Sequence, residues 1–580
     1  MLCNAGGHGV TLGDYLSVVG HGLSLDLSTA LYFLIVPFLY TMASVWVTLP
    51  RWILKVYYAI VALAFALAFV ADSSLYSFWG FKLDASCLQY LEQPEGITAS
   101  VSTGYILFRV LLVALVGILI YKAYGAIGPR ELHKGKTPLR QALVQTLVFI
   151  ALLPLMVIGI RGGVHESTTN IGQVYYSQNQ FLNHSAVNPV FSFLYSLGHQ
   201  LGDQSQYEFF AEEECHRLLS DVYTTESIGT DTLLNTTRPN VIVILMESAG
   251  ETFAQAMPRL QQLKKEGVNF TQCYGNSWRT DRGTVCTLSG YPSFPHTSIM
   301  KIPEKSRSLP SIARTLQTEG YRTTYLYGGD INFTNMRSYL ISTGWEQLIS
   351  MDDYSSAERK TAQWGVRDDI TFHTLYELIK EKSHTPEGGG GFLIGYSTLS
   401  SHEPWDVPTS TVANDEILNA FAYLDNCLGH FVDSIRQTPA WQDLLIVLTA
   451  DHGINYRDID QSRPKEKNHI PMLWIGGAVK APCTIDIICN QTDLCATLLG
   501  QLQLPHDDYR FSRDVLSESY RFPSAVHNYY NAQWLTDSTG QVLYDFDAQQ
   551  FIVSESTDAE RMLNTSKAIL QETINDLIKR

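Results

Sequence analysis

One short segment of the sequence concentrates residues that can handle a phosphate group. The run RTDRG begins at Arg279 and places Thr280 between two arginines, Arg279 and Arg282. A threonine hydroxyl becomes an effective nucleophile when a metal ion or a neighbouring base activates it, and guanidinium groups stabilise charge on phosphoryl oxygens. The segment therefore predicts a nucleophilic Thr280, with Arg279 or Arg282 at the phosphate. Solvation of a surface loop, or anchoring of the loop through Asp281, is the alternative role for the arginines.

Three further groups of acid/base side chains follow stretches that are predicted to be strands. Glu247 follows the first of these strands, His402 a later one, and Asp451 and His452 another. Ligands of parallel sheets gather at the carboxyl ends of the strands, so we expect these side chains to converge. Two carboxylates and an imidazole, joined by the hydroxyl of Thr280, form a mixed oxygen and nitrogen site suited to zinc or manganese, with magnesium as a further option. A helix cap or a turn is the alternative for any single motif.

The elements that must position these residues alternate along the second half of the chain. Apolar runs rich in β-branched residues separate amphipathic helical patterns, which is typical of a mostly parallel α/β sheet. Strands are expected at 240–246, 321–328, 391–397, 444–450 and 470–477, and helices at 254–266, 369–382 and 415–437. The glycine run at 388–391 is expected to be a loop. Short aromatic segments after about residue 505 predict a small antiparallel subdomain.

The first part of the chain is different, because it contains four long apolar runs. These runs are residues 29–48, 53–71, 104–121 and 142–160. Each is long enough to cross a bilayer as a helix, and a buried core helix is the alternative for any one of them, but four such runs in succession favour membrane spans. The sequence therefore predicts a polytopic transmembrane domain at 1–160. A polar, aromatic-rich connector at 161–236, a catalytic domain at 237–504 and a C-terminal subdomain at 505–580 follow it.

Basic residues indicate how these spans are oriented. They are concentrated in two connections between the apolar runs, and comprise Arg51, Lys55, Lys122, Arg130, Lys134, Lys136 and Arg140. By the positive-inside rule both connections are cytoplasmic, which places the amino terminus and everything after residue 160 outside. The connector contains a juxtamembrane helix, expected at 188–197, that can lie on the bilayer surface.

Charge and cysteine content agree with an exterior location. The formal net charge of −16 argues against nucleic acid as a partner. In this topology all nine cysteines lie on the outer side, where disulfides persist, and the odd number leaves at least one thiol free or paired with another chain. No cleavable signal is expected at the amino terminus.

Five motifs together carry a resemblance to a known family. They are NVIVILMES, RTDRGTVCTLSGYP, SSHEPW, LTADHG and NHIPMLWIGG, in this order after several membrane helices. This pattern resembles the lipoteichoic acid synthase-like branch of the alkaline phosphatase/sulfatase superfamily, to which phosphoethanolamine transferases are closely related. The resemblance implies that Glu247, Thr280, Asp451 and His452 bind a divalent metal, and that Thr280 is the nucleophile. Histidines matching His402 and His469 are implied to contact the substrate phosphate.

Two features depart from the family pattern. Family members usually have five membrane helices, whereas this chain has four predicted spans, and Met1 to Asp26 resembles the outer loop that follows the first helix. An arginine of the glycerophosphate pocket is matched only approximately, by Arg337. The donor headgroup therefore stays open between phosphoglycerol and phosphoethanolamine.

The expected function is that of a multi-pass transferase of the cytoplasmic (inner) membrane with an exterior catalytic domain. It is expected to move phosphoglycerol from a membrane phospholipid to a glycolipid, polymer, lipid A or glycan acceptor, through a phosphothreonine intermediate and with release of diacylglycerol. Phosphoethanolamine transfer to lipid A or a glycan is one alternative. A phosphodiesterase or sulfatase-like hydrolase is another, although Cys286 lacks the context of a formylglycine precursor. A non-catalytic lipid-binding membrane protein is the last.

Overall fold

The computed structural model describes residues 4–6, 8–88, 103–127, 137–198, 204–224, 229–384 and 391–580. Most of the second basic connection, with Arg130, Lys134 and Lys136, and the glycine run at 388–390 lie outside the described residues. The chain divides into two compact units, Met1–Gln200 and Leu201–Arg580. The predicted connector is therefore shared between the two units.

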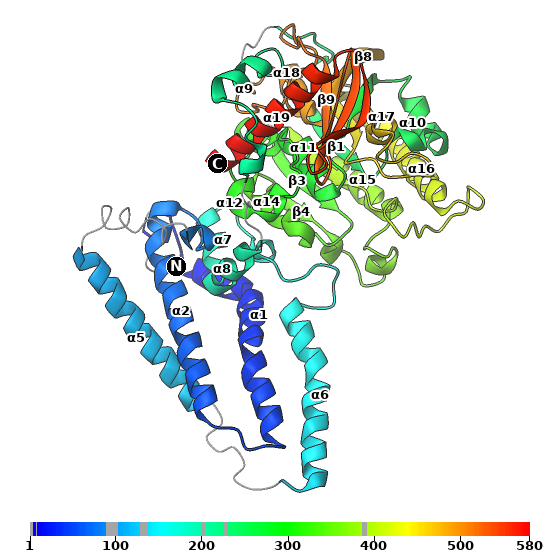
Figure 1. Cartoon of the computed structure of the whole chain (residues 1–580). Coiled ribbons are helices and arrows are strands. Elements are labelled where there is room, and N and C mark those ends of the chain that lie inside the picture. The colour runs from blue at the N-terminus through cyan, green and yellow to red at the C-terminus, as the bar shows by residue number, and fades with distance from the viewer. Residues whose placement is uncertain are drawn as a thin grey trace. The chain divides into compact units, whose positions relative to one another are not determined.

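The first unit contains four helices that are long and apolar enough to cross a membrane (Figure 1). They are α1 Leu12–Ser44, α2 Trp52–Trp79, α5 Thr103–Ile127 and α6 Leu139–Arg161, and they confirm the four predicted spans. Helix α1 begins well before the apolar run at residue 29, because Thr11 and Asp14 form a capping box at its start. Hydropathy marks the apolar span, whereas the cap determines where the helix begins.

Short helices complete the first unit. They are η2 Ala85–Leu88, η3 Ile171–Val174, α7 Gln180–Ala186 and α8 Pro189–Leu197. Helix α8 confirms the helix predicted at 188–197. Asn188 caps it by accepting hydrogen bonds from the backbone N–H groups of Val190 and Phe191 at 2.9 and 3.1 Å, and Pro189 occupies the first helical position.

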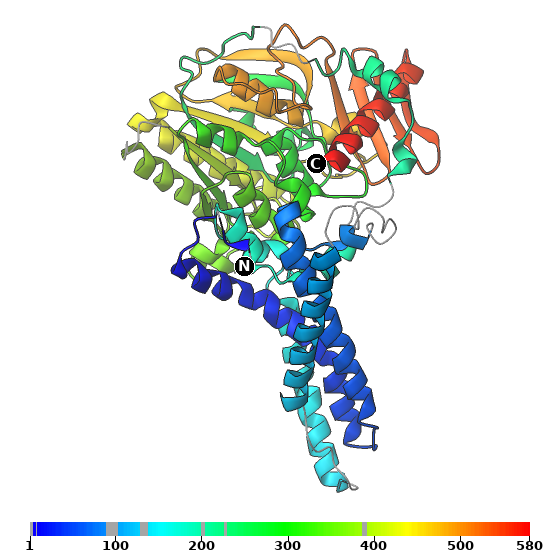
Figure 2. The ribbon, with the colours of Figure 1, turned by 90° about the vertical axis from the view of Figure 1, so that its left-hand side faces the viewer.

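The second unit is built on an eight-stranded sheet, with helices on both of its faces (Figure 2). Its strands are β1 Asn240–Met246, β2 Val268–Tyr274, β3 Arg322–Tyr327, β4 Gln347–Ile349, β5 Phe392–Ser397, β6 Leu444–Ala450, β7 Met472–Ile475 and β8 Cys483–Asn490. Their order is β4-β3-β5-β1-β6-β7-β2-β8. Only β7 runs antiparallel to its neighbours among the paired strands of this sheet, so the prediction of a mostly parallel sheet is confirmed.

The predicted strands and helices of this unit are present, with two kinds of difference. The continuous apolar runs became the buried central strands β1, β5 and β6, whereas the more polar β2, β4 and β8 were not predicted. The helix predicted at 254–266 is instead η5 Glu251–Ala256 followed by α10 Pro258–Leu263. Pro258 lacks a backbone N–H, so it starts a new helix better than it continues one.

The remaining helices of the second unit connect and cover these strands. They are α9 Glu212–Leu219, α11 Thr280–Ser289, α12 Pro303–Ser306, α13 Ile312–Thr318, α14 Met336–Ser342, α15 Asp368–His384, α16 Glu416–Arg436, α17 Pro464–Asn468, α18 Leu494–Gln501 and α19 Ala559–Lys579. Short 3₁₀ turns occupy several of the loops. Helices α15 and α16 match the predicted helices at 369–382 and 415–437.

A second, antiparallel sheet confirms the small C-terminal subdomain. Its strands are β9 Ser524–Asn528, β10 Ala532–Asp537, β11 Gly540–Asp545 and β12 Gln550–Ser556. Helix α19 packs on this sheet, and α9 of the connector packs against α19 through Cys215 and Leu219 (Figure 2). The eight described cysteines are all free thiols, and six of them are buried.

Candidate metal centre and catalytic pocket

Neighbouring strands bring three predicted metal ligands together. Strands β1 and β6 are parallel and pair in register up to Met246 and Ala450, so the residues that follow them emerge side by side. Glu247, Asp451 and His452 are all buried, and one ligand atom of each lies within 4.8 Å of the others. The predicted convergence at the carboxyl edge of the sheet is therefore present in the structure.

Thr280 lies beside this group at the start of a helix. It is the first residue of α11, and Arg279 occupies the N-cap position. Its hydroxyl donates a hydrogen bond of 3.1 Å to Glu247 Oε2, and its Oγ1 lies 3.5 Å from Nε2 of His452. The N-terminus of a helix carries partial positive charge, so this position favours an alkoxide or a phosphoryl group on the Thr280 oxygen.

Ser248 holds the two carboxylates in place. Its backbone N–H donates to Asp451 Oδ1 at 2.8 Å, and its hydroxyl donates to Glu247 Oε1 at 2.7 Å. To do this, Ser248 adopts a left-handed conformation with φ of 58°, which a residue with a side chain rarely adopts. Backbone strain of this kind persists where the surrounding structure enforces it, and it clusters at functional sites.

The donor atoms of this group fit a divalent cation. Asp451 Oδ2 is buried and has no hydrogen-bond partner within the described part of the chain. His452 Nδ1 lies 3.2 Å from the carbonyl oxygen of Gly453, which can only accept, so the ring donates from Nδ1 and keeps the lone pair of Nε2 for the site. A buried, unpartnered carboxylate oxygen and an imidazole nitrogen are ligands that zinc and manganese accept.

Two buried carboxylates also repel each other. Burial, and next the negative charge of Glu247, raise the pKa of Asp451 to about 7. Burial alone would raise the pKa of Glu247 as well, but His452, His402 and the hydrogen bond from Ser248 outweigh it, so the pKa of Glu247 is lowered. Without a cation the pair therefore carries one proton near neutral pH. A cation that displaces this proton relieves the repulsion.

A pocket of about 480 Å³ opens beside Thr280. His402 and Arg279, both predicted to contact the substrate, line it, and so do four aromatic side chains: Trp278, Phe333, Trp364 and Trp405. The ring of Trp364 lies edge-on to His402 with 5.0 Å between the ring centroids, and its indole N–H donates to the carbonyl of Glu403 at 2.6 Å. His402 Nδ1 lies 2.7 Å from the same carbonyl.

Sequence reasoning missed the aromatic wall of this pocket. Trp278 and Trp405 are close in sequence to Thr280 and His402, within or beside the motifs already singled out. Their positions in the sequence could therefore have predicted that they line the same pocket. Phe333 and Trp364 are far from both in sequence and reach the pocket only through the fold. Aromatic faces bind sugar rings and cations as well as apolar groups, so this wall is suited to contact the part of a substrate beyond its phosphate.

The two arginines beside Thr280 differ in position. Arg279 is exposed and lines the pocket. Arg282 is buried, donates to the backbone carbonyls of Phe294 and Pro295, and stacks on Trp278 with its guanidinium carbon 4.2 Å from the ring centroid. Arg279 therefore has the position for phosphate contact. Arg282 anchors the loop through backbone carbonyls rather than through Asp281, whose ion pair, at 3.8 Å, is with Lys301.

The structure does not bring His469 and Arg337 into this pocket. His469 Nε2 lies 2.8 Å from the carbonyl oxygen of Thr271 on β2, and its ring is tilted against Tyr274. Arg337 donates from Nε to Asn332 at 2.7 Å, and neither residue is among those that line the pocket. Sequence order alone could not show this, because the strand to which each residue is attached determines where its side chain lies.

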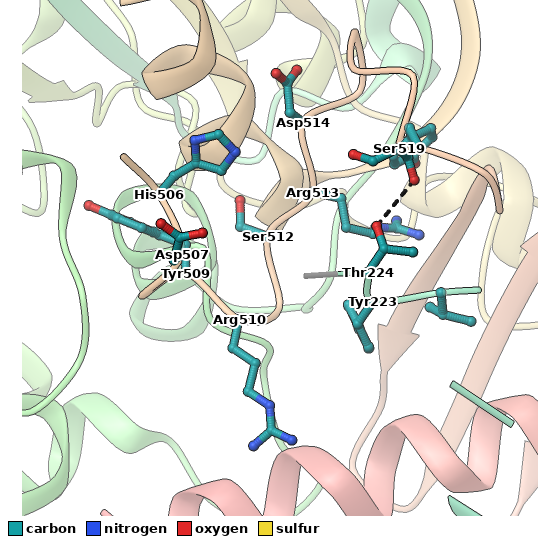
Figure 3. A pocket seen from close by; sticks show the side chains of 12 residues that line it. Tyr223, Thr224, His506, Asp507, Tyr509, Arg510, Ser512, Arg513, Asp514 and Ser519 are labelled. Atoms are coloured by element: carbon teal, nitrogen blue, oxygen red, sulfur yellow. Dashed lines mark hydrogen bonds between the residues drawn. The ribbon is translucent and has the colours of Figure 1, made fainter. Parts of the chain in front are cut away.

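A second hollow in the same unit has a different character (Figure 3). It has a volume of about 100 Å³ and is lined by residues 222–224 and by side chains between His506 and Tyr520. Its cations are already paired, because Arg513 contacts Asp493 at 2.7 Å and Arg510 contacts Glu572. The hydroxyl of Thr224 donates a hydrogen bond of 3.2 Å to the backbone carbonyl of Ser519, drawn as a dashed line in Figure 3. The larger pocket at Thr280 is therefore the candidate site.

Comparison with known proteins supports this choice. Residues 239–504, which include every residue of the candidate centre, match the Sulfatase family model. The Phosphoglycerol transferase I of Xanthomonas campestris pv. campestris (strain B100) is 25% identical over 314 residues. The match covers 48% of this chain and 43% of that protein, so the chain spans less than half of the length of this relative.

Solved structures agree on the fold of the second unit. A protein in the alkaline phosphatase superfamily from Vibrio parahaemolyticus superposes with a TM-score of 0.56 at 25% sequence identity, over 65% of this chain and 98% of that one. The lipoteichoic acid synthase LtaP of Listeria monocytogenes superposes with a TM-score of 0.51 at 15% identity, over 64% of this chain and 98% of that one, which concerns the fold alone. The resemblance predicted from the five motifs is confirmed.

Proposed function

We propose that this chain, which carries a sulfatase-family domain at residues 239–504, is a membrane-bound, metal-dependent transferase of phosphoglycerol. The donor is a membrane phospholipid, the leaving group is diacylglycerol, and the acceptor is a hydroxyl-bearing glycolipid, polymer, lipid A or glycan. One observation carries the proposal: the hydroxyl of Thr280 lies 3.1 Å from Glu247 Oε2, at the edge of a buried ligand set.

The residues of the centre have separate roles in this proposal. Glu247, Asp451 and His452 would hold a divalent cation, zinc or manganese, which would make the Thr280 hydroxyl more acidic and offset charge on the phosphate. Glu247 accepts the proton of Thr280, whose Oγ1 attacks phosphorus and forms a phosphothreonine. The bond from phosphorus to the diacylglycerol oxygen breaks, and His402 in its charged form gives that oxygen a proton. Arg279 contacts the phosphoryl oxygens.

The second half of the reaction reverses these roles. The acceptor hydroxyl attacks the phosphothreonine and loses its proton to His402, while the Thr280 oxygen leaves and regains the proton held by Glu247. Two steps suit this reaction, because a membrane donor and a separate acceptor then need not occupy the pocket together.

A matched pair of variants tests the nucleophile. Thr280→Ala is expected to abolish both the phosphorylated adduct formed with phospholipid alone and the release of diacylglycerol. Thr284 provides the control, because its hydroxyl is buried and unpartnered within the described residues, so Thr284→Val keeps the shape and costs little stability. Peptide mass spectrometry locates the adduct. An adduct on Thr284, or full turnover by Thr280→Ala, would overturn the assignment.

We place the protein in the cytoplasmic membrane as a multi-pass protein with its second unit outside. The support is the pattern of basic residues between its four apolar helices. A reporter that is active only outside is expected to work when fused after residue 170 and to fail at residue 134. The reverse pattern would reject this placement.

Phosphoethanolamine is the second candidate headgroup, and the aromatic wall of the pocket favours testing it. Aromatic faces attract an ammonium group, and Trp364 and Phe333 lie on that wall. The two donors are compared by measuring how fast diacylglycerol is released from phosphatidylglycerol and from phosphatidylethanolamine. The Thr280→Ala variant gives the background. We expect phosphatidylglycerol to give the higher kcat/KM, and a preference for phosphatidylethanolamine would select the alternative.

A further inference from the structure

A cavity of about 700 Å³ lies among the membrane helices of the first unit. Side chains from α1, α2 and α5 form most of its wall, with Phe149 of α6 and Asn188 completing it. Its lining is mainly apolar and aromatic and includes Phe33, Phe38, Tyr58, Phe65 and Tyr124. All of these residues belong to the unit Met1–Gln200, so the cavity is a feature of the membrane unit itself.

A proline within α1 fixes one side of this cavity. Pro37 has no backbone N–H, which leaves the carbonyl of Phe33 without its helical partner. The hydroxyl of Tyr57 on α2 donates to that carbonyl at 2.5 Å. An unsatisfied carbonyl is unfavourable at membrane depth, where no water can pair with it, so this bond joins α1 to α2 beside the cavity. The hydrogen bond from Tyr57 therefore fixes α1 to α2 at the position of Pro37.

Paired aromatic rings fix the rest of the wall. Phe33 meets Phe65 edge-on with 4.9 Å between ring centroids, Phe38 meets Phe149 at 5.1 Å, and Tyr58 meets Tyr124 at 5.4 Å. These rings pack on one another rather than filling the cavity. Because water gains few hydrogen bonds in an apolar cavity of this kind, a hydrocarbon chain from the bilayer is the occupant that its lining suits.

One end of the cavity is polar and negatively charged. Asp26 precedes the apolar run at residue 29, and its Oδ1 accepts a hydrogen bond of 2.6 Å from the side-chain amide of Asn188. The other oxygen of Asp26 makes no hydrogen bond within the described part of the chain. Asn188 is itself fixed, because its Oδ1 caps α8. No lysine, arginine or histidine is among the described residues that line the cavity.

These features determine which lipid fits. A lipid phosphate would meet a carboxylate without a neighbouring cation, which is unfavourable. A hydroxyl, in contrast, can donate to the second oxygen of Asp26 and leave its acyl chain among the aromatic rings. Diacylglycerol is the membrane lipid with this combination of a neutral hydroxyl head and acyl chains. The cavity is therefore complementary to diacylglycerol in both polarity and charge.

We propose that this cavity is a binding site for diacylglycerol, with the free hydroxyl at Asp26 and one acyl chain among Phe33, Phe65 and Phe149. That diacylglycerol is the reaction product of this protein rests on the proposed function. Binding of diacylglycerol in the cavity does not require turnover. A product site in the membrane unit would receive diacylglycerol after transfer and separate it from the charged donor.

The test uses the full chain carrying Thr280→Ala, so that binding is measured without turnover. A photoactivatable diacylglycerol in phosphatidylcholine vesicles is expected to label peptides of α1 and α2. Unlabelled diacylglycerol should compete at least tenfold better than phosphatidylglycerol or phosphatidylethanolamine. Equal competition by either phospholipid, or labelling confined to other segments, would overturn the proposal. A failure of the proposed function would appear separately, as a missing Thr280 adduct in the unsubstituted chain.

Two further substitutions sharpen this test. Ala30→Trp places an indole in the cavity and should reduce labelling at least tenfold, whereas Ala114→Trp, at an exposed position of α5 outside the lining, should leave it unchanged. Asp26→Asn removes the charge and should bring the preference for diacylglycerol over phosphatidylglycerol close to one. Because this second readout is a ratio between lipids, it stays decisive even if Ala30→Trp fails to fold. An unchanged ratio in Asp26→Asn would show that Asp26 does not select the lipid.

Discussion

The α-carbon of Gly283 faces the backbone carbonyl of Asp451, so closely that an added methyl group would lie 2.1 Å from that oxygen. Gly283 lies in the first turn of α11, the helix that begins at Thr280, and Asp451 follows β6. The absence of a side chain at this glycine therefore sets the distance between Thr280 and the three candidate metal ligands. Only hydrogen fits between the helix and the end of the strand.

Gly283→Ala is expected to push α11 away from the ligand set. Overpacking of this kind costs about 1–3 kcal/mol of stability, and the shift of Thr280 should lower adduct formation at least tenfold while some metal binding is retained. Thermal unfolding, metal content and the adduct assay measure the three effects. Gly320→Ala is the control, because no atom lies within 4 Å of a methyl group added at Gly320. This variant loses a glycine without a steric clash, although the positive φ of Gly320 adds backbone strain. Full adduct formation in Gly283→Ala would contradict the close-packing argument.

Metal affinity is expected to depend on pH through Asp451. Its pKa of about 7 in the cation-free site means that below pH 7 a cation must displace a proton from it. Affinity should therefore fall by about tenfold or more per pH unit well below 7, because the imidazole ligand must also be unprotonated, and should level off above pH 7. Metal titrations of the full chain between pH 5 and 9 would show this, with Thr280→Ala as a variant that keeps both carboxylates. A flat profile between pH 5 and 7 would show that no proton is displaced.

Arg279 and Arg282 are expected to respond differently to substitution. Arg282→Ala leaves the carbonyls of Phe294 and Pro295 without a donor, which should cost about 1–3 kcal/mol of stability and lower the melting temperature. Arg279→Ala should leave the melting temperature unchanged and lower kcat/KM. Unfolding curves and donor kinetics on the two variants separate these effects. Loss of stability in Arg279→Ala would show that this arginine is structural as well.

The two outer histidines provide a similar contrast. His402 lines the pocket, so His402→Ala should lower turnover at least tenfold with metal content unchanged. His469 instead contacts the carbonyl of Thr271, so His469→Ala should act mainly by loosening β2 and lowering stability. His469→Gln, which can still donate to that carbonyl, should restore most of the stability. A large fall in turnover with stability unchanged in His469→Ala would support the phosphate contact implied by the family resemblance.

Several elements could be predicted because their signal is local. The membrane helices follow from runs of apolar residues, and β1, β5 and β6 follow from continuous β-branched runs. Strands β2 and β8 were missed because their exposed faces carry polar residues, which hides the pattern of a buried strand. The start of α1 was misplaced because a capping box, rather than hydropathy, determines it.

The sequence by itself determined which groups are candidates for the centre, because residue type after a strand is enough to identify carboxylate, imidazole and hydroxyl groups that can share a metal. Tertiary structure decided which of the predicted substrate-binding residues reach the pocket. It places Arg279 and His402 on the pocket, Arg282 beneath the loop, and His469 against β2. The physical reason is that a side chain reaches only a few ångströms from its backbone, so its partner depends on which strands are neighbours. Strand order comes from long-range packing, which no local pattern of residues encodes.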